Sequence, residues 1–327
     1  MSANNASELI GVITGYLLPR CVHVAAELGI ADLLDDTPQS VETIAQAAHL
    51  QVDSLNRILR LLASHGIFKQ VSGGYDHTDL SRQLRSDHPQ SLRPYARMVG
   101  SPLFWQCFGE LQHAVVTGEP AMNKLDARGI FGYFKDHPDE GYIFNAAMEA
   151  KAQRDIQAVT EVYDFSAFRS IADIGGGRGH LLKAILAKSQ TSTGVLFDQP
   201  HVLEEAVPTE RLSLHPGDFF AGHLPKCEAY VLMEVLHDWN DQQCQQILAS
   251  LRDAAPRGAT LLVIETIMSE GFDAHFSQIL DVIMLVVTGG RERTKDQYEK
   301  LLDRNGFRLT RVIGTSSPCS IVEAVFG

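Results

Sequence analysis

Residues 173–179 constrain the fold of this chain more than any other segment, because they read Asp-Ile-Gly-Gly-Gly-Arg-Gly between an apolar strand and an amphipathic helix. Glycines let the backbone turn sharply and let a ligand approach bare amide groups. The start of the following helix also offers unpaired N–H groups to polar ligand atoms. The segment therefore indicates an α/β domain that binds an adenosine-containing cofactor, and a purely structural turn is the alternative interpretation.

The spacing of these glycines separates two classes of cofactor. Gly175, Gly177 and Gly179 alternate with other residues, whereas the dinucleotide fingerprint Gly-x-Gly-x-x-Gly would need a glycine where this chain has His180. An NAD-linked oxidoreductase is therefore the weaker interpretation.

Composition and charge narrow the range of partners. The chain has 327 residues, enough for two domains, and a net charge of −12, which argues against a nucleic-acid partner. Its five cysteines show no Cys-x-x-Cys spacing, which favours reduced thiols over disulfides or a metal site. No stretch approaches the roughly 20 apolar residues that cross a bilayer, and the first residues lack the plan of a signal peptide. We therefore expect a cytoplasmic protein that binds no metal, membrane or nucleic acid.

From residue 8 to about 165 the apolar spacing is typical of helices. Ser40 and Asp53 resemble N-caps of two successive helices, and 66–75 then reads as strand, Gly-Gly turn and strand. This order is a winged-helix pattern, which serves either DNA binding or packing. The second helix carries Arg57 and Arg60 but no dense basic face, so we favour a packing or dimerisation domain.

From about residue 168 onward strands and helices alternate, which predicts a mostly parallel sheet with helices on both faces. Ligands then bind beyond the carboxyl ends of the strands. A short link joins the last two strands into a hairpin, so one edge must be antiparallel. We expect helices after the glycine loop, Asn240 and Thr294, and strands at 170–174, 194–198, 211–214, 229–236, 260–265, 307–314 and 319–326. The predicted domains are 1–100, 101–165 and 166–327.

Two of these strands end in carboxylates that suit a nucleoside. Asp198 lies about 20 residues beyond the glycine loop, where it can accept hydrogen bonds from both ribose hydroxyls. Gly217-Asp218-Phe219 would place a carboxylate near an adenine amine and an aromatic ring beside the base. The structural alternatives are a cap on the turn after Asp198 and a β-turn at 217–220.

The fourth strand leads to His237, in the sequence Leu-His-Asp-Trp, where an imidazole can take up a proton near neutral pH. Glu265 ends the fifth strand and Glu292 precedes another helix, and either carboxylate could orient the ring. The alternatives are a structural histidine, and a salt bridge between Glu292 and Arg291 or Arg293.

Together these co-linear motifs resemble the S-adenosylmethionine-dependent O-methyltransferases of the plant caffeic-acid type and their bacterial natural-product relatives. The likeness covers essentially the whole chain. It implies a class I methyltransferase-like α/β fold, with a seven-stranded sheet and an N-terminal, mostly helical winged-helix dimerisation domain. It also implies an intertwined homodimer.

The resemblance assigns roles to individual positions. It makes His237 the base, flanked by Glu265 and Glu292. The cofactor S-adenosyl-L-methionine, which leaves as S-adenosyl-L-homocysteine, would contact Asp173, Gly175, Gly177, Asp198, Gly217, Asp218, Phe219 and Met233. Aromatic and methionine side chains suit a flat aromatic acceptor, and the candidates are Phe104, Trp105, Phe144, Met148, Met284 and Val287.

Two departures from the plant pattern affect the acceptor and the cofactor. Met233 stands where plant members carry a lysine, so one polar cofactor contact is missing or replaced by packing. Residues 149–152 read Glu-Ala-Lys-Ala in place of the plant Ser-Asp-His-Ser, which points to a microbial acceptor.

The predicted function is methyl transfer to a hydroxyl of a small, aromatic secondary metabolite. The alternatives are a diverted relative that uses the cofactor without methyl transfer, an N- or C-methyltransferase, and a winged-helix regulator that senses the cofactor.

Overall fold

A computed structural model of the protein describes residues 2–34, 37–271 and 275–327. The chain divides into two compact units, the first built from Met1–Gly109 and Tyr133–Ala152 and the second from Glu110–Gly132 and Gln153–Gly327. Residues 101–165 therefore contribute to both units, and the three-part division expected from the sequence stays a prediction.

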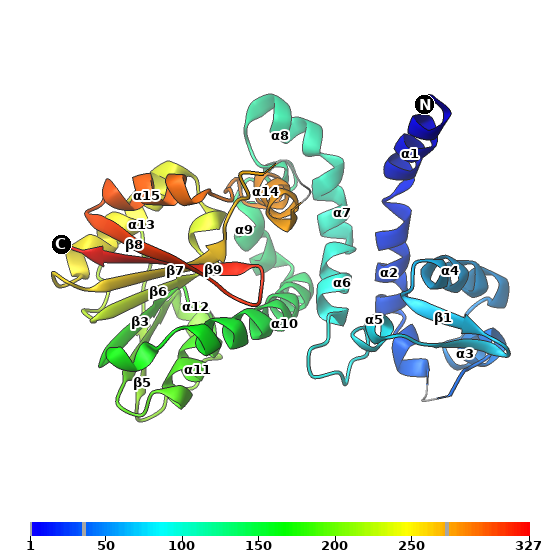
Figure 1. Ribbon diagram of the computed structural model, residues 1–327, viewed down its shortest axis with the longest axis horizontal. Coiled ribbons are helices and arrows are strands. Elements are labelled where there is room, and N and C mark those ends of the chain that lie inside the picture. The colour runs from blue at the N-terminus through cyan, green and yellow to red at the C-terminus, as the bar shows by residue number, and fades with distance from the viewer. Residues whose placement is uncertain (1, 35–36, 272–274) are drawn as a thin grey trace. The chain divides into compact units, whose positions relative to one another are not determined.

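Among the residues that the structure describes, the elements of the first unit are helices and one hairpin (Figure 1). Its elements are α1 (Ser2–Thr14), α2 (Leu17–Glu27), the 3-10 helix η1 (Ile30–Leu33), α3 (Val41–Ala47), α4 (Val52–Ser64), β1 (Phe68–Val71), β2 (Gly74–His77), α5 (Asp79–Arg82), α6 (Arg93–Val99) and α7 (Pro102–Gly109). Helices α9 (Gly129–Asp136) and α10 (Pro138–Val162) supply residues to both units.

The predicted helix–helix–hairpin order is present, with one error in a helix start. Ser40 caps α3, because its hydroxyl accepts a hydrogen bond from the Thr43 amide. Asp53 is not an N-cap: α4 begins at Val52 after Gln51, and Asp53 lies in the first turn. There its carboxylate favours the helix N-terminus and pairs with Arg57 one turn later.

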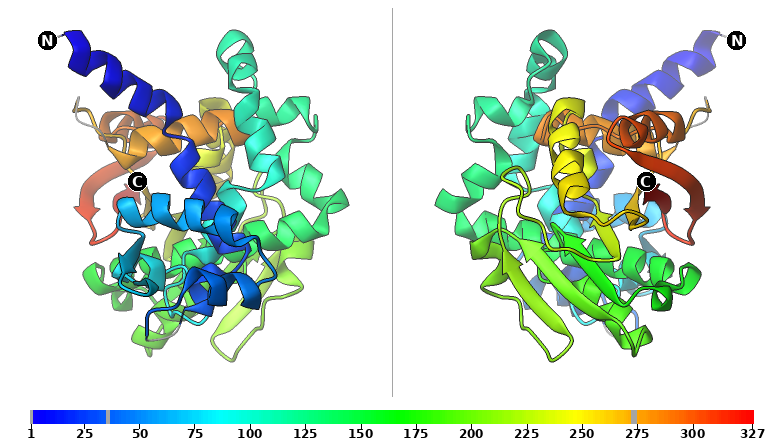
Figure 2. Two further views of the ribbon diagram at one scale, coloured as in Figure 1. Left: turned by 90° about the vertical axis from the view of Figure 1, so that its right-hand side faces the viewer. Right: turned by 90° about the vertical axis from the view of Figure 1, so that its left-hand side faces the viewer.

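One helical stretch contradicts the expectation that no segment is long and apolar enough to cross a membrane. By length and composition Asn5–Glu27 meets that requirement, and only 11% of its most apolar window is buried. A core helix of a soluble protein and a signal sequence meet the same requirement, so the finding is weak evidence for a membrane. Figure 2 shows α1 leading away from α3 and α4, and Leu9, Ile10, Val12 and Ile13 are exposed along it.

The second unit is built on a seven-stranded sheet with the order β5-β4-β3-β6-β7-β9-β8 (Figure 1). The strands are β3 (Ser170–Ile174), β4 (Thr193–Asp198), β5 (Leu212–Pro216), β6 (Ala229–Met233), β7 (Thr260–Thr266), β8 (Phe307–Gly314) and β9 (Cys319–Phe326). Strands β3 to β7 pair in parallel, and β9 runs antiparallel to both β7 and β8, so β8 has the same direction as the five parallel strands. The predicted mostly parallel sheet with one antiparallel edge is confirmed.

Helices cover both faces of this sheet. The helices of the second unit, not all of which lie on the sheet, are α8 (Leu111–Thr117), η2 (Ala121–Lys124), η3 (Phe165–Ala167), α11 (His180–Lys188), α12 (Pro200–Leu203), η4 (Leu236–Asp238), α13 (Asp241–Ala254), α14 (Phe276–Val287) and α15 (Lys295–Asp303). In β6, Tyr230 and Leu232 join a core with α13 and α15, while Val231 between them is buried on the other face. Burial on both faces explains why these strands read as continuous apolar runs.

The fourth predicted strand, 229–236, is three residues too long. Strand β6 ends at Met233 because Glu234 adopts a left-handed backbone conformation (φ 52°), and the 3-10 turn η4 follows. His237 therefore lies on this short turn beyond the sheet.

Candidate active site

The carboxyl ends of β3, β4, β5 and β6 meet along one edge of the sheet, because these strands are parallel neighbours. The residues that follow them are the glycine loop, Asp198, Gly217 to Phe219, and the turn with His237. Segments far apart in the sequence are thereby brought to one edge, as the sequence predicts.

The glycine loop turns in a conformation that side chains disfavour. Gly175 and Gly177 have φ values of 70° and 58°, in the left-handed region. The Gly177 amide donates a hydrogen bond of 2.8 Å to Asp198 Oδ2, which ties the loop to the end of β4. An added Cβ at Gly175 would also lie 3.0 Å from Val235. The bare backbone and the neighbouring carboxylate fit the adenosyl part of the predicted cofactor.

Asp198 caps the turn that follows β4, which was the structural alternative for this residue. Its carboxylate can nevertheless accept further hydrogen bonds from a ligand. Its Oδ1 accepts the Gln199 amide at 2.7 Å, which caps the following turn. Burial raises the pKa of this carboxyl, and the amides of Gly177 and Gln199 oppose the rise. Each carboxylate oxygen has a second lone pair, so ribose hydroxyls can still donate to it.

Asp173 lies beneath the loop, with an exposed fraction of 1%. A Cβ on Gly176 would collide with its carboxylate, so glycine at this position lets the loop lie against the carboxylate, whose Oδ2 is buried without a hydrogen-bond partner. Burial and the nearby charge of Asp198 raise the pKa of Asp173 to about 7. A direct contact of Asp173 with the cofactor stays a prediction.

The third strand end combines a turn with an aromatic cluster. Asp218 Oδ1 accepts the Phe220 amide at 2.8 Å, as in the β-turn alternative. The ring of Phe219 meets Phe220 and Trp239 edge to face, with centroids 4.8 and 6.0 Å away. Gly217 is needed where it stands, because a Cβ would lie 2.6 Å from the Phe197 ring. Met233, at the end of β6, is half-buried.

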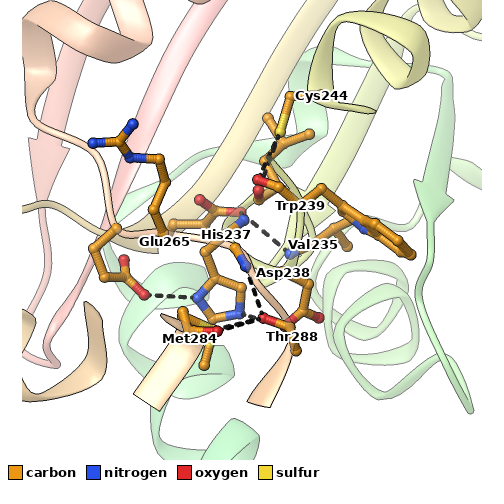
Figure 3. Close-up of polar contacts among 12 residues, drawn as sticks. Val235, His237, Asp238, Trp239, Cys244, Glu265, Met284 and Thr288 are labelled. Carbon is orange, nitrogen blue, oxygen red and sulfur yellow. Dashed lines mark hydrogen bonds and ion pairs between the residues drawn. The ribbon is translucent and has the colours of Figure 1, made fainter. Parts of the chain in front are cut away.

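The base candidate His237 is buried and bonded through one ring nitrogen (Figure 3). Its Nδ1 lies 2.8 Å from Glu292 Oε1. Its other nitrogen, Nε2, lies 3.9 Å from Asp238 Oδ1, too far for a hydrogen bond. Nε2 is therefore the nitrogen on which a proton can be exchanged.

Opposing effects set the proton affinity of this ring. Burial lowers the pKa of His237, but the hydrogen bond to Glu292 and the charges of Asp238, Glu265 and Glu292 outweigh it and raise the pKa to about 9. Glu292 Oε2 is buried without a hydrogen-bond partner, so its charge depends on the imidazolium for compensation. The structure thus corrects the sequence-based value near neutrality.

Glu265 acts on the backbone of the base rather than on its ring (Figure 3). Its Oε1 accepts the amides of His237 at 3.1 Å and of Val235 at 3.2 Å. Its Oε2 accepts the hydroxyl of Tyr298 from α15. Burial raises the pKa of Glu265 to about 7, against the positive charges of His237 and Arg293.

Residues 289–293 hold the turn that carries His237 by binding the carbonyl groups of that turn. The Arg291 amide donates to the His237 carbonyl at 2.8 Å. A Cβ on Gly290 would collide with that carbonyl, so only glycine fits there. The buried Arg293 donates to the carbonyls of Leu236 and Trp239, each at 2.9 Å.

The structure does not show the salt bridge between Glu292 and Arg293 that was one alternative for Glu292. The guanidinium of Arg293 pairs with Asp241 at 2.8 Å, at the start of α13. Glu292 is instead positioned through its own amide, which donates to Asp281 Oδ1 at 2.8 Å.

The acceptor-pocket candidates are divided between the two units. Phe104, Trp105, Phe144 and Met148 belong to the first unit, and Met284 and Val287 lie on α14 in the second. Phe104, Met284 and Val287 are buried. Their joint role as a pocket lining stays a prediction.

Three potential metal ligands from distant parts of the sequence also come together. Asp155, Glu234 and Cys319 each offer one ligand atom within 4.8 Å of the others. Acidic groups gather in this way in many proteins without an ion, so the expected absence of a metal also stays a prediction.

The sequence did not reveal Tyr298, Arg293 or Gly290 as parts of this site. The Gly-Gly-Arg-Glu-Arg-Thr motif drew attention to 289–294, but nothing in it shows that Gly290 and Arg293 face the turn of His237. Tyr298 reads as an ordinary apolar-face residue of α15. Only the packing of α15 against β7 gives it a polar partner.

Comparisons with known proteins agree with this geometry. A family model described as an O-methyltransferase domain matches residues 108–308, and one described as an O-methyltransferase dimerisation domain matches residues 10–87. Phenazine O-methyltransferase PhzM of Lysobacter antibioticus is 40% identical over 98% of this chain and 96% of its own. Phenazine-1-carboxylate N-methyltransferase of Pseudomonas aeruginosa is 31% identical over 94% of this chain and 93% of its own.

A solved structure extends the likeness to the whole fold. CalO1, a methyltransferase of calicheamicin biosynthesis in its SAH-bound form, matches with a TM-score of 0.91 at 31% identity, covering 100% of this chain and 99% of that one.

Proposed function

The chain belongs to the O-methyltransferase family, and on that premise we propose that it methylates a hydroxyl group of a small aromatic natural product, with His237 as general base. Membership makes it an S-adenosylmethionine-dependent methyltransferase of the bacterial natural-product type. Oxygen as the methyl acceptor and an aromatic substrate are the parts that we add.

The observation that carries this proposal is the His237–Glu292 pair. The 2.8 Å bond to Nδ1 fixes the ring and leaves Nε2 for proton exchange. A base so placed removes the proton of a hydroxyl as its oxygen becomes a nucleophile, and Glu292 stabilises the imidazolium that forms. General-base help of this kind is typically worth about 10²–10⁴-fold in rate.

The residues present fit the cofactor. The bare backbone at Gly175 and Gly177 and the carboxylate of Asp198 would hold the adenosyl part, with Asp218 and Phe219 beside the base. When bound, S-adenosyl-L-methionine supplies an electrophilic methyl group on a sulfonium. The acidic balance of the chain, with a net charge of −12, is compatible with such a cationic ligand.

We propose a flat, hydroxylated aromatic acceptor, because aromatic and methionine residues dominate the predicted lining and a phenazine O-methyltransferase is 40% identical. An N-methyltransferase is the second candidate, since relatives at 31% identity include one that acts on phenazine-1-carboxylate.

We further propose that the protein works as a soluble, cytoplasmic homodimer. Residues 10–87 form a dimerisation domain, which supports self-association. The exposed apolar residues of Asn5–Glu27 would then be covered by a second copy rather than by lipid. Sedimentation in detergent-free buffer would show a dimer, and recovery only in a membrane fraction would contradict this assignment.

Product mass after incubation with the cofactor and 1-hydroxyphenazine tests the reaction. We expect a gain of one methyl group on oxygen, at least 100-fold slower in His237→Ala, with cofactor binding retained. Methyl transfer to nitrogen would favour the second candidate. Cofactor consumption without a methylated product would favour a diverted enzyme, and full activity of His237→Ala would sink the base assignment.

A further inference from the structure

We propose that Tyr298 is a positioning residue for the base, which holds the backbone turn of His237 through Glu265. The proposal rests on the proposed role of His237 in proton transfer. It concerns a residue of α15 that lies 61 positions from His237 in the sequence and acts through Glu265 rather than on the ring.

The chain of contacts is continuous and buried. Tyr298 and Glu265 both have an exposed fraction of 0%. The Tyr298 hydroxyl donates to Glu265 Oε2, and Glu265 Oε1 accepts the amides of Val235 and His237 at 3.2 and 3.1 Å. One carboxylate therefore connects α15 to both ends of the segment that places the base beyond β6.

The Tyr298 hydroxyl favours the ionised form of the Glu265 carboxylate, which is the form that holds the two amides most tightly. A buried carboxylate is costly unless hydrogen bonds satisfy both oxygens, and Tyr298 supplies the donor on the Oε2 side. Without it, protonation is the way for Glu265 to relieve its charge. A protonated Glu265 holds the two amides less tightly and adds less negative charge near the His237 ring.

The start of α15 fixes Tyr298 in turn. Thr294 caps the helix with a capping box, and the Tyr298 amide donates to the Thr294 carbonyl at 3.0 Å. The residue before the cap is Arg293, whose guanidinium holds the carbonyls of Leu236 and Trp239. Residues 293–298 thus anchor the His237 turn in two ways. Tyr298 acts on the amides of the turn through Glu265, and Arg293 binds the carbonyls of the turn.

Tyr230 offers a matched control in the same core. It is also 0% exposed, and its hydroxyl donates to the Pro225 carbonyl at 2.8 Å and accepts the Cys227 amide at 3.1 Å. Tyr230→Phe removes a buried hydroxyl as Tyr298→Phe does, without touching Glu265. Any general effect of losing such a group appears in both variants.

The experiment compares the wild type, Tyr298→Phe, Tyr230→Phe and Glu265→Gln. Turnover of 1-hydroxyphenazine is measured against pH, and the His237 imidazole is titrated by NMR, its signal assigned by its loss in His237→Gln. For Tyr298→Phe we expect kcat to fall about tenfold, equal to about 1.4 kcal/mol in the barrier, with the KM for S-adenosyl-L-methionine within about twofold. The His237 titration should move to lower pH, and Tyr230→Phe should leave both readouts unchanged.

Two results would overturn the proposal. One is an unchanged kcat and titration in Tyr298→Phe, and the other is an equal change in Tyr230→Phe. If Tyr298→Phe does not fold, Glu265→Gln tests the link through which Tyr298 must act: a neutral amide there must also shift the His237 titration to lower pH, and an unchanged titration would overturn the proposal. If the wild type methylates nothing, the proposed function fails, while the NMR titration still tests Tyr298.

Discussion

Glu292→Gln tests the electrostatic account of the site most directly, because it keeps the shape and the hydrogen-bond acceptor but removes the charge. With the pKa of His237 raised to about 9, only about 1% of the ring is neutral at pH 7 in the wild-type free enzyme. Only a neutral ring can accept a proton. The wild-type kcat/KM should therefore rise about 50-fold between pH 7 and pH 9.

The size of the change follows from the 2.8 Å contact between Nδ1 and Oε1. A hydrogen bond to a charged group is stronger than a neutral one by about 1–1.5 kcal/mol, which corresponds to about one pH unit. In Glu292→Gln the rise should shift from about pH 9 to about pH 8 or below. At pH 7 about tenfold more of the His237 ring is then neutral in the variant, and this larger fraction offsets the lower basicity of the ring. Well above pH 9 the ring is neutral in both enzymes, so the variant should be about tenfold slower than the wild type.

The assay is transfer of a labelled methyl group to 1-hydroxyphenazine from pH 6 to pH 10. Because the acceptor titrates equally with every enzyme, the ratio of variant to wild type isolates the protein. Glu228→Gln is the matched control, since Glu228 lies at the opposite edge of the sheet, where its Oε2 accepts the Arg169 amide at 2.7 Å. A variant-to-wild-type ratio that stays constant across this pH range would refute the assignment of Glu292 as the charge that sets the basicity of His237.

Three further changes test other parts of the structure. Gly290→Ala forces a Cβ against the His237 carbonyl, so we expect overpacking to lower the free energy of unfolding by about 1–3 kcal/mol and turnover to fall tenfold or more. The control is Gly314→Ala, whose Cβ meets nothing within 4 Å and which should change neither melting temperature nor rate. Asp173 has a raised pKa of about 7, so its native state binds a proton more tightly than the unfolded chain, and stability falls as pH rises from about 4 to 7. Asp173→Asn should flatten that fall in thermal melts at pH 5 and pH 8, and an equally steep fall in the variant would contradict the buried-charge account. Arg293→Lys cannot reach two carbonyls and Asp241 at once, so it should lower kcat more than it raises KM, and wild-type kinetics would show that the three contacts are dispensable.

The sequence predicts the α/β unit well because local patterns decide it. The strands at 170–174, 307–314 and 319–326 match the structure at both ends, and Asn240 and Thr294 cap their helices as expected. Apolar runs, capping residues and glycine turns are local properties. Errors arise where local signals compete, as at 234–236, where an apolar run continues but the backbone leaves the sheet at Glu234.

The polar residues of the site are predicted less completely. His237, Glu265 and Glu292 could be found because each ends a strand or precedes a helix, and the family motif marks them. Their exact contacts depend on side chains from distant elements, so the sequence could not show that Glu265 bonds the backbone and Glu292 the ring. Nor could it show the raised pKa of His237, which arises because the hydrogen bond to Glu292 and three nearby negative charges outweigh the opposing effect of burial.

The anchoring of the His237 turn has a consequence for changing the substrate. Its supports, from Glu265, Tyr298, Gly290 and Arg293, all lie in the buried interior of the sheet unit. The predicted acceptor contacts lie on other segments, in the first unit and on α14. We therefore predict separate sets of residues for chemistry and recognition: libraries that randomise the predicted acceptor contacts should explore new acceptors while the proton-transfer residues stay unchanged.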